Sequence, residues 1–283
     1  MRRISMLAAL TALALSSTIA LALEGRDEVP FKLYRGYVIV VRGCIGGLKN
    51  LNLVVDTGAI PGVLDARIAR RLHLQGRPER VDLPIKTLET ERVTVPNVEL
   101  GPTHVDELSM IVQDLSFAEE ALGTRVDGMI GFDVLGQVPF TIDYESRKLV
   151  FGPVDPSFVT TPYSPDLPYA IVLLHVQQET LGILVDTGAS NLVLFQRGVR
   201  NCRSAINTVG RETWVSMGGD MPVAKAQLLD AYLGGMPWGQ RVAYIPENST
   251  NQPIGVSGLL GTAALGKRVG FDPSRKVVAW EAK

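Results

Sequence analysis

The chain has 283 residues, of which 46% are hydrophobic and 20% charged, and its formal net charge is −1. This length and composition are typical of a folded globular protein with one large or two smaller cores, and they exclude a disordered chain. The balanced charge provides neither a basic field nor an acidic tail, so we expect no nucleic-acid partner.

The first 22 residues are typical of a secretion signal. Arg2 and Arg3 precede an apolar run that ends in Ala20-Leu21-Ala22, which gives a charged start, an apolar segment and a small-x-small cleavage site. We interpret residues 1–22 as a signal peptide and expect a periplasmic or secreted protein with no membrane contact after cleavage. The alternative is an uncleaved anchor, because the run is nearly long enough to span a bilayer, although the hydroxyl residues at 16–18 weaken it.

Branched and alternating apolar residues predict strands in the first half of the chain. One strand is expected from Leu33 to Val41 and another from Leu51 to Val55, with a turn at 46–50 between them. An amphipathic helix is expected from Pro61 to Leu72, because apolar residues recur at helical spacing and proline suits a first helical turn. The remaining predicted elements are several short strands over 81–115, a helix at Ser116–Leu122, and a closing hairpin of Phe140–Asp143 and Lys148–Phe151.

Four prolines between positions 156 and 168 favour a stiff, extended segment. We place a linker there, at 154–166, between an N-terminal lobe at 23–153 and a C-terminal lobe at 167–283. The second lobe is expected to repeat the strand order of the first. Its predicted strands are Tyr169–Val176, Leu181–Val185, Leu228–Leu233, Val242–Ile245 and Val277–Trp280.

Two motifs occur in both halves at one common offset. A branched apolar strand ends at Asp56-Thr57-Gly58-Ala59, and another ends at Asp186-Thr187-Gly188-Ala189. A segment that begins Asp127-Gly128 likewise corresponds to one that begins Ser257-Gly258, so both motifs repeat after 130 residues (186 − 56 and 257 − 127). This regularity predicts a duplicated unit with internal pseudo-twofold symmetry.

An Asp-Thr-Gly motif after an apolar strand, followed later by two apolar residues and glycine, resembles the aspartic proteases. The alanine after each glycine is more similar to the retroviral and bacterial retropepsin-like branch than to pepsin. Two identical retropepsin chains each supply one aspartate, whereas this chain carries both, as pepsin does. The resemblance extends over most of residues 33–280, and it implies an all-β, two-lobed acid-protease β-barrel fold with internal pseudo-twofold duplication, in a monomer.

The resemblance implies that Asp56 and Asp186 form a catalytic dyad. Two full charges about 3 Å apart at an effective dielectric of about 20 repel by roughly 5 kcal/mol, so we expect one proton between them. One carboxylate would take a proton from water while the other donates to the scissile carbonyl oxygen. Thr57 and Thr187 resemble the family's hydroxyls that bond the opposite loop, with local turn capping as the alternative.

The rest of each motif supports the carboxylates. Gly58 and Gly188 permit close backbone approach. Ala59 and Ala189 stand where pepsins have serine or threonine, which donate an additional hydrogen bond to the outer carboxylate oxygens. With fewer donors to stabilise the anion, we expect an activity optimum less acidic than that of pepsin.

In this family a flap, which is a hairpin over the bound peptide, excludes water. Residues 77–100 contain neither the glycine nor the tyrosine that family flaps tend to show. The second half has a candidate in Trp214, Met217, Gly218 and Gly219, because paired glycines suit a mobile hairpin tip and the large side chains could cover substrate. An ordinary surface hairpin is the alternative.

Other reactive residues show no chemical pattern. The histidines at 73, 104 and 175 lack ligand spacing, so we expect no metal and no cofactor. Asp127 corresponds to a serine in the repeat and is assigned a role in a turn. Cys44 and Cys202 do not correspond in the repeat, and the sequence leaves open whether they pair or are separate buried thiols.

The function expected from these features is hydrolysis of peptide bonds by an aspartic endopeptidase acting on a peptide or protein. The alternative is a catalytically silent peptide-binding protein with the same two-lobed fold. Two retained carboxylates argue against it, because a binder has no need of two acids at repulsive distance. A processing enzyme limited to one partner protein is a further alternative.

Overall fold

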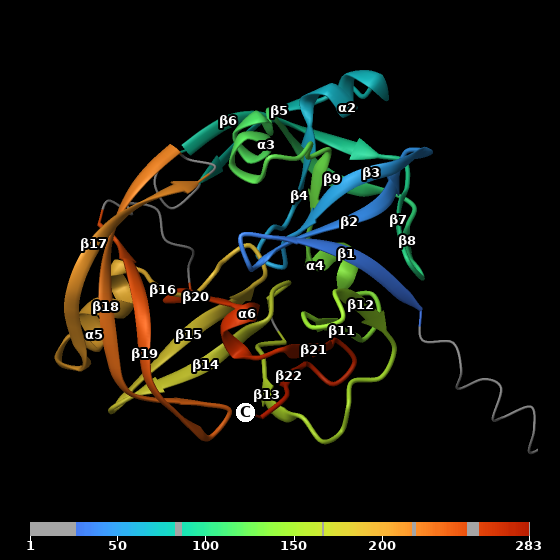
Figure 1. Ribbon diagram of the computed structural model, residues 1–283. Coiled ribbons are helices and arrows are strands. Elements are labelled where there is room, and N and C mark those ends of the chain that lie inside the picture. The colour runs from blue at the N-terminus through green and yellow to red at the C-terminus, as the bar shows by residue number, and fades with distance from the viewer. Residues whose placement is uncertain (1–26, 83–86, 166, 217–218, 248–254, 283) are drawn as a thin grey trace, which may run out of the picture.

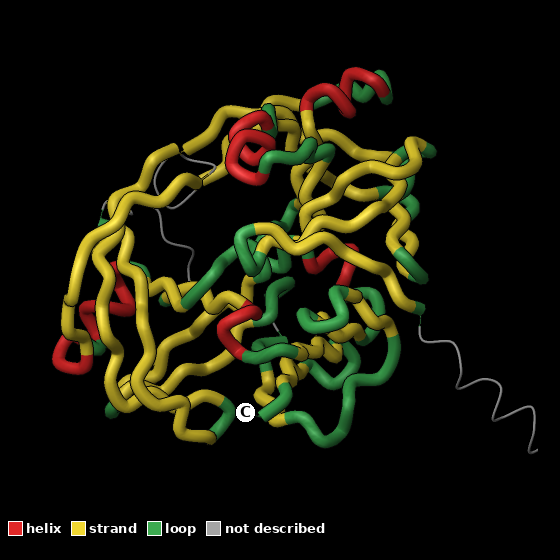
Figure 2. The backbone as a smooth tube through the Cα atoms, in the orientation of Figure 1, coloured by secondary structure: helices red, strands yellow, loops and turns green. Residues whose placement is uncertain are grey.

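The computed structural model describes residues 27–282 except 83–86, 166, 217–218 and 248–254. The signal peptide predicted for 1–22 lies outside these residues. Within them, no helix is both long and apolar enough to cross a membrane. Strands dominate and the helices are short, as Figure 2 shows, which confirms the predicted all-β fold.

The first half is built on a sheet whose central strands are buried. Its central strands are β2 (Val38–Ile45), β3 (Leu48–Val55), β10 (Gly128–Ile130), β4 (Gly62–Asp65) and β9 (Leu108–Gln113). β2 and β3 are antiparallel, β3 and β10 parallel, β10 and β4 antiparallel, and β4 and β9 parallel. The parallel β3–β10 contact places the ends of both motif strands at one edge, with Val55 opposite Ile130.

The second half repeats this arrangement with every strand direction preserved. Its strands are β14 (Ile171–Val176), β15 (Glu179–Asp186), β20 (Gly258–Gly261), β16 (Leu192–Leu194) and β19 (Met236–Pro246). β14–β15 and β20–β16 are antiparallel, whereas β15–β20 and β16–β19 are parallel. The duplication predicted from the two motifs is therefore present in the strand topology.

Each half also carries a long hairpin at the end of its sheet (Figure 1). These hairpins are β5–β6 (Arg77–Asp82 and Thr87–Val95) in the first half and β17–β18 (Ile206–Ser216 and Gly219–Leu233) in the second. A cross-strand ion pair stands at the equivalent place in both. Arg92 contacts Glu79 at 2.9 Å, and Lys225 contacts Glu212 at 3.5 Å.

A shared sheet joins the two halves. It contains the hairpin β11–β12 (Phe140–Asp143 and Lys148–Phe151) from the first half and β21–β22 (Arg268–Asp272 and Val277–Trp280) from the second. β11 pairs with β21, so that Phe140 lies opposite Phe271. These two rings are fully buried and stack with centroids 4.9 Å apart and planes 13° apart. β1 (Glu28–Tyr34) and β13 (Val159–Pro162) extend this sheet beside β12 and β22.

The remaining elements are short. Strands β7 and β8 form a small hairpin beside β2. Its strands and the helices are β7 (Val98–Leu100), β8 (Thr103–Val105), α2 (Ala66–Arg71), α3 (Ser116–Leu122), α4 (Phe132–Leu135), α5 (Gln196–Asn201), the 3₁₀ turn η1 (Arg203–Ala205) and α6 (Thr262–Leu265).

Several sequence predictions were wrong in detail. The single strand expected at 33–41 is interrupted, because Arg35 and Gly36 adopt positive φ and turn the chain from β1 into β2. The helix expected from Pro61 begins at Ala66 instead, where the Asp65 side chain accepts from the Arg67 amide as an N-cap; the residues before it form β4.

Other strands are longer than expected. The predicted strand at 228–233 is the end of the 15-residue β18, where bulges interrupt the regular alternation that signals a strand. Strand β13 lies inside the segment expected to be a linker. By contrast, the helix at 116–122 and the strands at 140–143, 148–151 and 277–280 have the predicted bounds. Cys44 and Cys202 are separate, buried free thiols.

We predict that the stacked phenylalanines hold the halves together. Phe140→Ala and Phe271→Ala should each lower the free energy of unfolding by about 3–5 kcal/mol, since each leaves a cavity in a fully packed sheet. Urea denaturation measures this. The double variant should lose less unfolding free energy than the sum of the two single losses, by about 0.5–1.5 kcal/mol. Both single variants lose the same ring contact, and the double variant loses it only once. Leu173→Ala, at a side chain that is 51% exposed, is the matched control. Additive costs would contradict a direct energetic coupling.

Candidate active site

The structure brings Asp56 and Asp186 together. Asp56 directly follows β3, and its amide donates to the carbonyl of Ile130 at 2.9 Å. Asp186 is the last residue of β15 and lies opposite Gly261 in the parallel pairing with β20. The two carboxyls lie within interaction distance, so that each affects the pKa of the other. Two acids 130 positions apart (186 − 56) are thus direct neighbours at the junction of the halves.

Thr57 and Thr187 exchange hydrogen bonds between the two loops. The Thr57 amide donates to Thr187 Oγ1 at 2.9 Å, and the Thr187 amide donates to Thr57 Oγ1 at 3.0 Å. Each hydroxyl then donates to the strand of the other half, from Thr57 to the Val185 carbonyl at 2.9 Å and from Thr187 to the Val55 carbonyl at 2.7 Å. Both threonines are buried. Both hydroxyls therefore bond the opposite loop and strand and do not cap their own turns.

The glycines allow each loop to lie against the opposite acid. A Cβ at Gly58 would stand 2.8 Å from Asp186 Cγ, and one at Gly188 would stand 2.9 Å from Asp56 Oδ2. Their amides also donate within their own loops, from Gly58 to Asp56 Oδ1 at 3.0 Å and from Gly188 to Asp186 Oδ1 at 2.6 Å. Any larger residue at either position would force the opposite carboxyl to move. Ala59 follows in the same turn, with its amide donating to the Asp56 carbonyl.

The electrostatics of the pair favour one retained proton. Burial raises the pKa of Asp56, although the interaction with Asp186 and the hydrogen bond from the Gly58 amide offset part of this effect. Burial also raises the pKa of Asp186, and the neighbouring Asp56 carboxylate raises it further, well above its ordinary range. The arrangement can therefore hold a proton on one carboxyl and leave the other as a base, which is the requirement for acid and base catalysis from one pair.

Two tyrosines near the pair were not predicted from the sequence. Tyr144 and Thr262 join the halves through their hydroxyls, which lie 2.6 Å apart. Burial raises the pKa of Tyr144 to about 12, with a further contribution from the charge of Asp186. The pKa of Tyr37 is also raised, mainly by burial and to a smaller extent by Asp186. Neither tyrosine belongs to a repeated motif, so the sequence did not mark them as site residues. The available signal was the position of Thr262, the partner of Tyr144, directly after the motif that begins Ser257-Gly258.

Asp127 does not join the pair. It is buried, accepts a hydrogen bond from the Asn52 amide at 2.9 Å, and forms an ion pair with Arg125 at 2.7 Å. It anchors the chain just before β10, which is a structural role like the one predicted.

The flap candidate is described in part. Met217 and Gly218 lie outside the described residues, and Gly219 is the first residue of β18. Trp214 lies on β17, where its ring is 4.5 Å from that of Tyr244. The β5–β6 hairpin occupies the equivalent place in the first half although it lacks the sequence features expected of a flap. A substrate-covering role stays a prediction for the hairpin of the second half.

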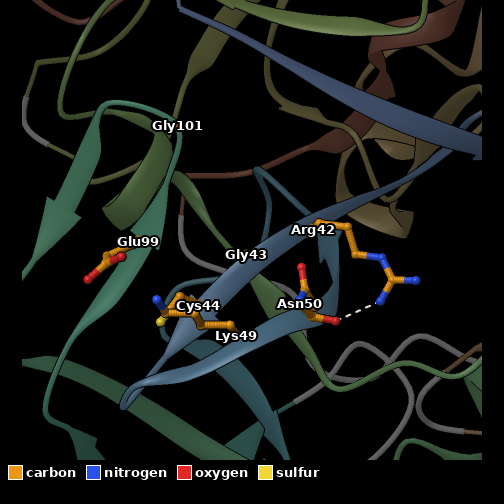
Figure 3. Close-up of a pocket in the computed structure, with 7 residues that line it drawn as sticks. All are labelled: Arg42, Gly43, Cys44, Lys49, Asn50, Glu99 and Gly101. Carbon is orange, nitrogen blue, oxygen red and sulfur yellow. Dashed lines mark hydrogen bonds between the residues drawn. The ribbon is translucent and has the colours of Figure 1, made fainter.

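Outside the pair, the described residues form no metal centre, and the hollow in the first half is no catalytic site. Within those residues, no three His, Cys, Asp or Glu side chains gather as metal ligands. A shallow hollow of about 240 Å³ on the first half is lined by charged residues, but they do not converge (Figure 3). Arg42 donates to the Asn50 carbonyl at 2.6 Å, whereas Glu99 lies on the other side of the hollow.

Residues 41–134 match the family model described as aspartyl protease. A retropepsin-like aspartic protease from Rickettsia conorii is 19% identical, with 45% of this chain and 89% of that chain covered and a TM-score of 0.34. Conglutin gamma, a basic 7S globulin from lupine seeds, is 13% identical, with 92% and 96% covered and a TM-score of 0.47. No curated protein matches the sequence. The family match confirms the resemblance predicted from the sequence: over residues 41–134, which contain Asp56 and its loop, this chain is similar to the aspartyl proteases.

Proposed function

We propose that the protein is an aspartic endopeptidase that hydrolyses peptide bonds through Asp56 and Asp186. The observation that supports this most directly is the close approach of the two carboxyls, each lying against the opposite glycine loop, in loops locked together by Thr57 and Thr187. Burying two acids against each other is costly, and such a cost is typical of sites where pKa values are shifted for catalysis.

In the proposed reaction a water molecule lies between the carboxyls and the scissile bond. The ionised carboxyl accepts a proton from this water while the water oxygen attacks the carbonyl carbon. The protonated carboxyl donates its proton to the carbonyl oxygen. The resulting tetrahedral diol collapses when the C–N bond breaks. Its nitrogen takes a proton from the pair, one diol hydroxyl returns a proton to the pair, and a carboxylic acid and an amine leave. Every proton moves among water, substrate and the two acids.

The same proposal includes export by the segment at 1–22 and action as a monomer, since one chain supplies both acids. A catalytically silent peptide binder is the competing function. The repulsion between the acids has no use in such a binder, whereas it keeps a proton available for catalysis.

We predict that Asp56→Asn and Asp186→Asn each reduce cleavage of a peptide library by about 10³-fold or more, because each removes one partner of the proton transfer. Glu107→Gln, at an exposed carboxylate outside the site, is the control and should retain wild-type activity. Cleavage by either asparagine variant at the wild-type rate would overturn the mechanism. A wild type that binds peptides without cutting any would favour the silent binder.

The pH dependence of activity should change with the number of hydrogen-bond donors to the paired carboxylates. Ala59→Ser adds a hydroxyl that can donate to the Asp56 carboxylate, so the acidic limb of the pH–rate profile should move to lower pH by up to about one unit. Ala59→Gly changes the same position without a donor and should leave that limb in place. An acidic limb that does not move with serine, or that moves equally with glycine, would contradict this account of the optimum.

Stability should depend on pH in a direction set by the raised pKa values of both acids. The folded protein binds the dyad's proton more tightly than the unfolded chain, so this contribution to stability is complete below about pH 4, the ordinary aspartate value, and is lost as pH rises through the folded pKa. Asp186→Asn removes the titration. It should therefore be more stable than wild type at neutral pH, by about 1.4 kcal/mol for each unit of raised pKa. Urea denaturation from pH 4 to 8 tests this, with Glu107→Gln as control, and equal or lower stability at neutral pH would contradict it.

A further inference from the structure

The second half contains a hollow that is separate from the paired acids. It lies between the α5–η1 segment and the sheet β17–β18–β19, and its volume is about 370 Å³. Its apolar wall is formed by Val199, Ile206, Ala224 and Ile245, and Arg200 and Arg203 lie at its edge. Pockets for small molecules in proteins begin at about 300 Å³, and they combine apolar walls with a few polar groups.

The internal repeat explains why this hollow is open. In the first half, Glu91 on β6 stands opposite Val112 on β9; in the second, Ala224 on β18 stands opposite Ile245 on β19, which is the equivalent place. The Glu91 side chain packs against the chain at Gly76, where an added Cβ would lie 2.5 Å from its Oε2. A methyl group replaces that long side chain in the second half, so the space is left unfilled.

The charge at the hollow is positive. The side chains of Arg200 and Arg203 are exposed and have no hydrogen bond or ion pair with any residue that the structure describes. Glu247 also lines the hollow, but Arg211 neutralises it at 2.7 Å. Two guanidinium groups are therefore available beside an apolar wall, and guanidinium binds carboxylates through paired N–H donors.

We propose that this hollow binds a small carboxylate with an apolar tail, with the tail against Ala224 and Ile245 and the carboxylate on Arg200 and Arg203. This chemistry has two sources, a free alkyl carboxylic acid and the C-terminus of a peptide that ends in an apolar residue. The binding is independent of whether the paired acids turn over a substrate.

Isothermal titration of the protein with octanoate tests the proposal. Octanoate should bind saturably at one site, and octanamide, which has the same tail without the charge, should bind at least about tenfold more weakly. The double variant Arg200→Gln/Arg203→Gln should lose affinity for octanoate by at least about tenfold. Arg70→Gln is the matched control, since Arg70 is exposed and is the repeat counterpart of Arg200 (200 − 70 = 130).

Ala224→Glu places in the hollow the residue type that the first half uses, and it should abolish octanoate binding. Should this buried change prevent folding, the two exposed arginine substitutions still decide the outcome. A parallel titration with acetyl-Ala-Leu and its amide identifies the source: tighter binding of the dipeptide acid than of octanoate assigns a peptide C-terminus, and the reverse assigns a free acid. Equal binding of octanoate and octanamide, equal affinity of the double variant and wild type, or no saturable binding up to about 5 mM would overturn the proposal.

Discussion

The exchange of hydrogen bonds between Thr57 and Thr187 is the contact on which the candidate site depends. Each threonine accepts from the amide of the other and donates to a carbonyl in the opposite half, and all four bonds lie in a buried environment. Buried backbone groups that lose their partners are costly, so neither loop can move away from the other without leaving several groups unsatisfied. This network keeps two acids in contact that would otherwise separate.

The rest of the fold supports that contact from two directions. The parallel pairs β3–β10 and β15–β20 bring each acid to the end of a buried strand, so the loops start from rigid positions. The shared sheet, with Phe140 stacked on Phe271, fixes the halves relative to each other. Both arrangements offset the cost of burying carboxyls that repel. The raised pKa values reflect that cost, because burial and repulsion disfavour the ionised form.

Duplication has also left the halves chemically different. The aliphatic pair Val81 and Ile111 in the first half corresponds to Trp214 and Tyr244 in the second, and Glu91 corresponds to Ala224. The backbone topology tolerates these exchanges because it depends on strand pairing, while the side chains on the outer hairpins are free to differ. Such exchanges change the shape and charge of surfaces without disturbing the paired acids.

The sequence by itself determined the repeat, the all-β class and the identity of the two acids, because strand periodicity and the repeated Asp-Thr-Gly motifs are local signals with a common offset. Short elements such as Ser116–Leu122 and Phe140–Asp143 were predictable for the same reason. Tertiary structure decided what depends on contacts between distant residues. Packing between segments produced the turn at Arg35–Gly36, the capping of α2 by Asp65, the Tyr144–Thr262 contact and the hollow beside Ala224. Local residue patterns do not indicate which distant segments will pack together.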